Sequence, residues 1–176
     1  TIWQAKKKCP QLTLVAPHHA LYETYSERIN TIYGEYTDLV EPFSIDESWL
    51  DVTQTLYRFG TGQQIADELR RRIREEIGIT ISVGVSFNKT FAKLGSDYKK
   101  PDATTVITRE NYRDILWPLS ARDMMFVGSA SAERLARVGI ETIGAIALAG
   151  REQMKSLLGR SGETIWEYAM GMDSSP

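Results

Sequence analysis

The sequence has one cysteine, two histidines and no long hydrophobic run, and each scarcity excludes a class of protein. Cys9 alone cannot form an internal disulfide, which is typical of proteins from a reducing cytoplasm. No stretch of about 18 apolar residues is present, so we expect no transmembrane helix and no membrane partner. His18 and His19 lack the partner spacing of a zinc site. Cysteine usage therefore favours a cytoplasmic protein.

An excess of charge of either sign is also missing. The sequence has 21 Lys and Arg residues against 23 Asp and Glu residues, for a formal net charge of -2 at pH 7. Nucleic-acid-binding domains are usually basic, so this balance gives no indication of a nucleic-acid partner. With 42% apolar and 25% charged residues, the composition is that of an ordinary globular protein. Its length suggests one domain, or one domain with a small appendage.

Hydrophobic periods of 2 and 3.6 residues alternate along the sequence, which indicates mixed strands and helices. Helices are expected at residues 19–38, 63–77 and 88–98, and short strands at 12–16, 40–45, 49–52, 79–85 and 104–107. After Pro118 no strand-like run remains, and short helical segments are separated by four glycines, Gly128, Gly139, Gly150 and Gly159. The sequence thus predicts an α+β part over residues 1–118 and an all-helical part over residues 119–176.

Two adjacent carboxylates, Asp46 and Glu47, interrupt an otherwise apolar segment that is expected to form a strand–turn–strand unit. Burying an ionised carboxylate costs several kcal/mol, so the pair needs a cation, a charged partner or solvent. At the bend of a hairpin both carboxylates can reach one point, which suits Mg²⁺ together with substrate phosphates. The alternative is an ordinary polar turn, in which Asp serves the turn geometry.

A predicted helix after Asn88 carries Lys89, Lys93 and Asp97 on one face. The opposite face is apolar and is expected to pack on the sheet through Phe91, Leu94 and Tyr98. Helix N-termini favour anions, so a triphosphate between metal-loaded carboxylates and these lysines is chemically sensible. The alternative is a solvated face with an ordinary Lys93–Asp97 pair.

The segment from Val127 to Ile140 resembles a helix–hairpin–helix turn. Backbone N–H groups of Gly128, Ser129 and Ala130 are candidates for binding a nucleic-acid phosphate, with Arg134 adding charge. A helix pair with glycine C-caps explains the same pattern without any ligand.

Together, four blocks resemble the Y-family of DNA polymerases, in its DNA polymerase IV (DinB) and UmuC-like branch. They are residues 44–51, residues 88–101, Val127-Gly128 and residues 139–144. The resemblance implies that residues 1–118 are a palm, with a mixed, mainly antiparallel sheet and helices on one face. Residues 119–176 would be a small helical thumb that holds primer–template DNA. The implied activity is template-directed, error-prone synthesis past damaged bases in DNA repair.

The resemblance also assigns roles to single residues. Asp46 and Glu47 would be catalytic and would hold two Mg²⁺ ions, while Lys100, with Lys93 nearby, would contact the incoming deoxynucleoside triphosphate. One ion would activate the primer 3′-hydroxyl and the other would stabilise the leaving pyrophosphate. A sliding clamp is a further candidate partner, through a region outside this chain.

The family's first catalytic Asp and its aromatic gate against ribonucleotides would precede Thr1, and its little finger would follow Pro176. We therefore expect a protein of about twice this length, by the resemblance, with this piece inactive alone. Two other readings stay open: a catalytically dead relative acting as a repair adaptor, and a palm-type nucleotide cyclase. Retained Asp46 and Glu47 speak against the first, and the thumb-like segment speaks against the second.

Overall fold

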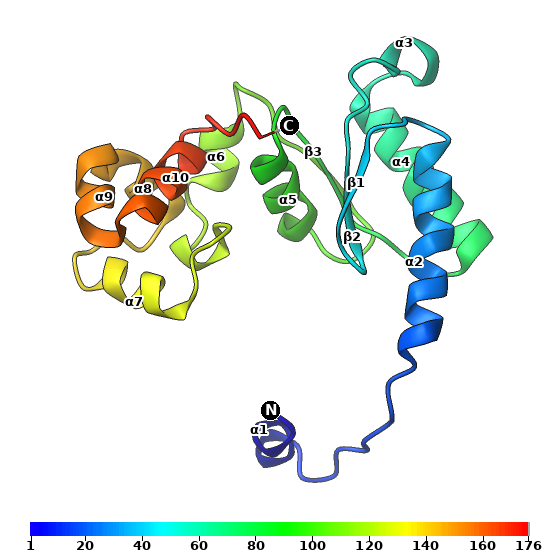
Figure 1. Ribbon diagram of the computed structural model, residues 1–176, viewed down its shortest axis with the longest axis horizontal. Coiled ribbons are helices and arrows are strands. Elements are labelled where there is room, and N and C mark those ends of the chain that lie inside the picture. Colours follow the sequence, from blue (N-terminus) through cyan, green and yellow to red (C-terminus); the bar gives the residue numbers. More distant parts are fainter. Residues whose placement is uncertain (176) are drawn as a thin grey trace.

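A computed structural model describes residues 1–175 (Figure 1). The first part contains α1 (Ile2–Lys8), α2 (His19–Gly34), β1 (Val40–Ser44), β2 (Glu47–Leu50), α3 (Leu56–Phe59) and α4 (Gly62–Arg72). A π-helical turn (Ile73–Ile77) extends α4, and β3 (Val83–Val85), α5 (Lys89–Tyr98), β4 (Thr104–Val106) and α6 (Tyr112–Leu116) follow. After a 3₁₀ turn (Ala121–Asp123), the chain forms α7 (Ser129–Ala136), α8 (Ile143–Ala149), α9 (Arg151–Leu158) and α10 (Arg160–Ala169).

The strands form two separate pairs. β1 and β2 are an antiparallel hairpin in which Val40 pairs with Leu50, whereas β3 and β4 run parallel with Val83 opposite Thr104. The predicted α+β class with mixed strand directions is confirmed, and within residues 1–175 the two pairs are not hydrogen-bonded to each other. The predicted strand at residues 12–16 is wrong: this segment is extended and exposed, because no other segment of residues 1–175 pairs with it.

Helices α4 and α5 lie on opposite faces of the β3–β4 pair. A Cβ added at Gly84 would lie 1.8 Å from the carbonyl oxygen of Ala92 in α5, so only glycine permits this approach of β3 to α5. The next residue, Val85, points the opposite way and contacts Gly62 at the start of α4. The pair is thus held between α4 and α5, which fixes α5 relative to the rest of the first part (Figure 1).

Two hydrophobic clusters form the interior. The smaller one joins α2, α4 and the π-helical turn, and its buried residues are Ile32, Tyr36, Ile65, Leu69 and Ile73. The larger one includes Phe91 and Leu94 of α5 and continues through α6 into the helices after residue 119. Tyr98 was expected to pack with Phe91 and Leu94 but is 41% exposed, because it is the last residue of α5.

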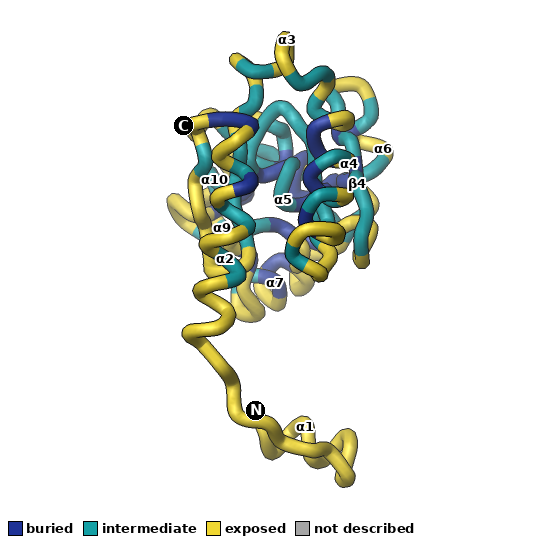
Figure 2. The backbone as a smooth tube through the Cα atoms, turned by 90° about the vertical axis from the view of Figure 1, so that its right-hand side faces the viewer, coloured by how far each residue is buried: buried dark blue, intermediate teal, exposed yellow. Residues whose placement is uncertain are grey.

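The N-terminal elements are largely exposed. Helix α1 and the extended segment after it lie away from the body of the molecule, and the tube in Figure 2 is coloured as exposed along this stretch. The helix predicted at residues 19–38 is buried only near its C-terminal end, while Leu21 and Tyr22 are half exposed. None of the helices within residues 1–175 combines the length and the apolar character needed to cross a membrane.

Candidate functional site

The hairpin turn presents Asp46 and Glu47 side by side, as predicted. Asp46 is exposed at the tip and accepts a hydrogen bond from Ser44 Oγ at 2.7 Å. The hairpin is fixed from both sides: Ser48 Oγ donates to Asn30 Oδ1 of α2 at 2.7 Å, and Trp49 Nε1 donates to the Lys89 carbonyl of α5 at 3.1 Å. These contacts set where the carboxylates stand relative to α5.

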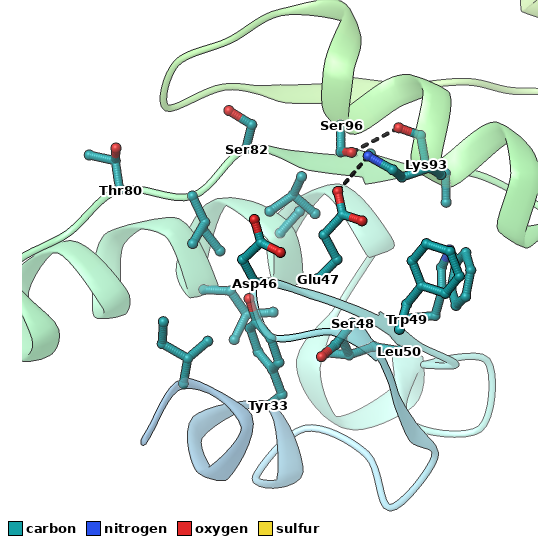
Figure 3. Close-up of a pocket in the computed structure, with 18 of the residues that line it drawn as sticks. Tyr33, Asp46, Glu47, Ser48, Trp49, Leu50, Thr80, Ser82, Lys93 and Ser96 are labelled. Carbon is teal, nitrogen blue, oxygen red and sulfur yellow. Dashed lines mark hydrogen bonds and ion pairs between the residues drawn. The ribbon is translucent and has the colours of Figure 1, made fainter. Parts of the chain in front are cut away.

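Both carboxylates point into a groove of about 840 Å³. Figure 3 shows them directed from the hairpin toward the segment that contains Thr80 and Ser82, with Lys93 facing Glu47. The groove is lined by residues of α2, both hairpin strands, α4, residues 79–86, α5 and the Lys100–Asp102 loop. Tyr33 lines its lower side beneath Asp46, and burial raises the pKa of this phenol to about 12, so its hydroxyl keeps its proton at neutral pH (Figure 3).

Four charged side chains of alternating sign connect the hairpin to the end of α5. Lys93 Nζ lies 2.5 Å from Glu47 Oε1 and 2.8 Å from Asp97 Oδ2. The other Asp97 oxygen, Oδ1, lies 2.7 Å from Lys100 Nζ. Lys93 is therefore shared by two carboxylates, whereas Lys100, with 55% of its side chain exposed, keeps donor capacity toward the groove.

The pKa values of Lys93 and Asp97 are shifted by the ion pairs that these residues form. Burial opposes the charge on Lys93, but hydrogen bonds to Asp97 and Glu47 outweigh it and raise the pKa of the ammonium. Burial likewise opposes the charge on Asp97, and hydrogen bonds from Lys100 and Lys93 lower the pKa of the carboxyl. Lys93 and Asp97 are therefore both charged at neutral pH.

The N-terminus of α5 already holds an anion from the chain itself. Asn88 Oδ1 accepts from the Phe91 N–H at 2.8 Å, and Asp173 Oδ2 accepts from the N–H and the hydroxyl of Thr90 at 3.1 and 2.8 Å. Asp173 follows α10, so its carboxylate takes the place expected for a phosphate. Lys89 is also engaged, by Glu41 and by the ring of Trp49.

Sequence reasoning missed two arginines that hold the loop carrying Lys100. Arg70 Nε and Nη2 lie 3.1 and 3.0 Å from Asp102 Oδ1, and Arg74 Nη1 lies 2.7 Å from Asp102 Oδ2. The sequence predicts a helix over residues 63–77 but indicates no partner for its arginines. Helix α4 contacts β4, which follows the loop that carries Lys100. This tertiary contact brings the arginines to the loop, and the order of residues along the sequence does not indicate it.

The groove supplies part of a site for a hard divalent cation. Two adjacent carboxylates on a turn, one of them exposed, are the oxygen ligands that Mg²⁺ binds together with substrate phosphates. Within residues 1–175 no three His, Cys, Asp or Glu side chains are grouped to hold a metal ion. The residues therefore fit Mg²⁺ only as two ligands of a larger set.

The predicted DNA-backbone residues also lie together. Gly128, Ser129 and Ala130 open α7, and all three are exposed, with no backbone N–H of theirs hydrogen-bonded inside the described chain. Arg134 is exposed one turn further along α7. Gly139, with φ of 77°, ends the motif, since its N–H bonds to Ala136 and the next N–H bonds to Leu135.

Comparison with known proteins gives consistent matches. The model of the impB/mucB/samB family matches residues 1–97. The chain is 47% identical over its whole length to a DNA polymerase IV of Acetivibrio thermocellus, and 41% identical over 99% of its length to DNA polymerase IV 1 of Bacillus subtilis. It spans 44% and 42% of those relatives, so it covers less than half the length of each.

Solved structures agree with the sequence relatives. A DinB crystal structure from Sulfolobus solfataricus matches 99% of the chain and 52% of its own chain, with a TM-score of 0.88 and 30% identity. An insertion ternary complex of Dbh DNA polymerase matches the same shares with a TM-score of 0.86. From its motifs, its fold and these relatives, we conclude that the chain belongs to the impB/mucB/samB family, in the DNA polymerase IV branch of the Y-family polymerases.

Proposed function

We propose that the protein containing this chain is a template-directed DNA polymerase of the lesion-bypass type, which adds deoxynucleotides to a primer 3′-hydroxyl using two Mg²⁺ ions. The observation that supports this most directly is the groove, which Asp46 and Glu47 of the hairpin and Lys100 of the loop after α5 all line. Residues 1–118 would act as the palm and residues 119–176 as the thumb.

In this proposal the carboxylates of the groove bind the metal ions and its lysines bind the triphosphate. Asp46 and Glu47 would provide the ligands on this chain for Mg²⁺, which when bound neutralises charge on the phosphates and favours ionisation of the primer hydroxyl. Lys100 would donate to a triphosphate oxygen, because its ammonium has donors beyond the one used by Asp97. Lys93 would hold Glu47 in place and act as the weaker phosphate contact.

The helical part would bind DNA without reading its sequence. The free N–H groups of Gly128, Ser129 and Ala130 at the start of α7 and the exposed charge of Arg134 suit a backbone phosphate. We expect this contact to position the duplex and to contribute little to selection of the nucleotide.

The decisive experiment is primer extension by the full-length protein and by its Asp46→Ala and Glu47→Ala variants with Mg²⁺ present. Each variant should lose more than about 100-fold in rate, the scale of removing one preorganised electrostatic group. Folding and DNA affinity should change little, because Asp46 is exposed at a turn and contacts Ser44 only locally.

Several outcomes would overturn the proposal. Wild-type extension by Asp46→Ala would remove the role of this carboxylate. A full-length protein that binds primer–template DNA without extending it would be a repair adaptor, and one that forms a cyclic nucleotide would be a cyclase. Normal extension by residues 1–176 alone would contradict a different expectation, that this piece is inactive by itself.

A further inference from the structure

The loop between α5 and β4 is held by an arginine of α4, Arg70, which is not part of the series of charged residues from Glu47 to Lys100. This loop, residues 99–103, carries Lys100 and leads into β4 at Thr104. Asp102 within it has φ of 49°, a left-handed conformation disfavoured for a residue with a Cβ. Such a conformation persists where its surroundings hold it.

A single guanidinium supplies most of that hold. Arg70 donates from Nε and Nη2 to Asp102 Oδ1 and from Nη2 to the Asp102 carbonyl oxygen. Its Nη1 lies 3.3 Å from Thr104 Oγ1, so the same side chain binds the loop on both sides of Ala103. The second Asp102 oxygen is occupied by Arg74.

The anchor is itself rigid. Arg70 follows Leu69 on α4 and precedes Ile73, and these two residues are 3% and 0% exposed in the smaller core. Its own side chain is only 20% exposed, and Asp67 Oδ1 accepts from Nη1 at 3.3 Å. The guanidinium is therefore held by its own helix as well as by the loop.

We propose that Arg70 is a positioning residue, which acts through Asp102 to hold Lys100 where it meets the incoming nucleotide. Lys100 lies two residues before Asp102, and its ammonium is fastened on the other side by Asp97 of α5. Arg70 holds the loop at Asp102 and Asp97 holds the Lys100 ammonium, so the ammonium stays at the groove. The Lys100 side chain then loses less conformational entropy when a triphosphate binds. This inference rests on the proposed function, in which Lys100 contacts the triphosphate.

The test is steady-state primer extension by the full-length protein, with the nucleotide concentration varied at saturating DNA. Arg70→Ala should raise KM for the nucleotide about tenfold, while kcat at saturating nucleotide changes less than about twofold. The matched control is Arg71→Ala, on the same helix and with the same loss of charge, whose guanidinium contacts Glu68 and Glu75 and not the loop. It should leave KM unchanged.

A double-mutant comparison separates positioning from general destabilisation. If Arg70 acts through Lys100, Arg70→Ala should add no further increase in KM once Lys100→Ala is present. An equal increase in both backgrounds would overturn the inference, as would a lower kcat with unchanged KM. If thermal melting shows that Arg70→Ala is not folded, Asp102→Asn tests the same contact. An unchanged KM in Asp102→Asn would also overturn the inference.

The Lys100→Ala variant alone keeps the two proposals distinct. It should raise KM at least tenfold, as loss of a charge-assisted phosphate contact does. If Lys100→Ala leaves KM unchanged, the proposed nucleotide contact fails. If Lys100→Ala raises KM while Arg70→Ala does not, only the positioning role fails.

Discussion

Asp46 and Glu47 are neighbours in the sequence, yet the structure gives them different surroundings. Asp46 is exposed at the tip of the turn, whereas the Glu47 carboxylate is paired with Lys93. A cation that binds both must compete with an ammonium at Glu47 and only with water and Ser44 at Asp46. The two carboxylates are therefore unequal ligands, which adjacency in the sequence could not indicate.

The lowered pKa of Asp97 gives a prediction for acid stability. The folded-state pKa lies below the unfolded value, so this carboxyl contributes stability that is fully present above about pH 4 and is lost as the pH falls through the folded value. In Asp97→Asn full-length protein, the fall in unfolding free energy below pH 4 should be smaller, by about 0.2–1 kcal/mol for so exposed a group. Chemical denaturation as a function of pH measures it.

Salt provides the control for that experiment. Pairing with Lys93 and Lys100 is electrostatic and half exposed, so the difference between wild type and Asp97→Asn should shrink in about 1 M NaCl. A difference that persists unchanged in high salt would contradict the pairing as its cause.

At the scale of elements, α5 is the piece on which the site is assembled. Its solvent face pairs with the hairpin through Lys93, its buried face enters the larger core through Phe91 and Leu94, and its N-terminus binds Asp173. Periodicity predicted the charged face of this helix and its apolar face apart from Tyr98. It could not predict Asp173 at the N-terminus, because 83 residues separate the two partners of that contact.

The close approach of β3 to α5 predicts a large effect of one methyl group. A Cβ at Gly84 would lie 1.8 Å from the Ala92 carbonyl oxygen and 2.6 Å from the Ser96 nitrogen, both of them backbone atoms that cannot turn aside. Gly84→Ala should therefore lower the free energy of unfolding by about 1–3 kcal/mol, the scale of overpacking. Thermal or denaturant unfolding of the full-length protein measures it.

Gly34→Ala is the matched control for that substitution. Gly34 ends α2, and a Cβ there would meet nothing within 4 Å, so alanine should be neutral or stabilise by up to about 1 kcal/mol. Equal destabilisation by both substitutions would show that the β3–α5 contact is not the cause.

At the scale of the whole molecule, the larger hydrophobic cluster runs through both predicted parts. The larger core continues from α5 across residues 118 and 119 into α7–α10, so the boundary predicted there is not marked by a break in packing. Asp173, beyond α10, returns to α5 and ties the end of the helical part to the groove's central helix. The division into palm and thumb stays a prediction about what each part binds.

The proposed DNA contact predicts a change confined to binding. Arg134→Ala in the full-length protein should weaken DNA affinity modestly and reduce the slope of log K against log salt by about one, without changing KM for the nucleotide. Fluorescence anisotropy at several salt concentrations measures both quantities. Lys155→Ala is the control, because Lys155 is paired with Glu163. If Lys155→Ala matches Arg134→Ala, Arg134 has no special role at the phosphate.

The sequence by itself determined the local structure and the family. Turn and periodic patterns are properties of neighbouring residues, so they predicted the hairpin with Asp46 and Glu47, the helix after Asn88 and the glycine-separated helices near Gly128. Net charge gave no indication of the proposed DNA partner, since a formal value of -2 says nothing of where the charges lie.

Only the tertiary structure decided which distant charges meet. The Lys93–Glu47 pair, the Asp173 cap on α5 and the arginines on Asp102 join residues 28 to 83 positions apart. The segment at residues 12–16 has strand-like residues but pairs with no other segment of residues 1–175, because a strand requires a partner as well as a propensity. These contacts form because tertiary packing brings distant elements together. Patterns among neighbouring residues do not indicate which distant residues meet.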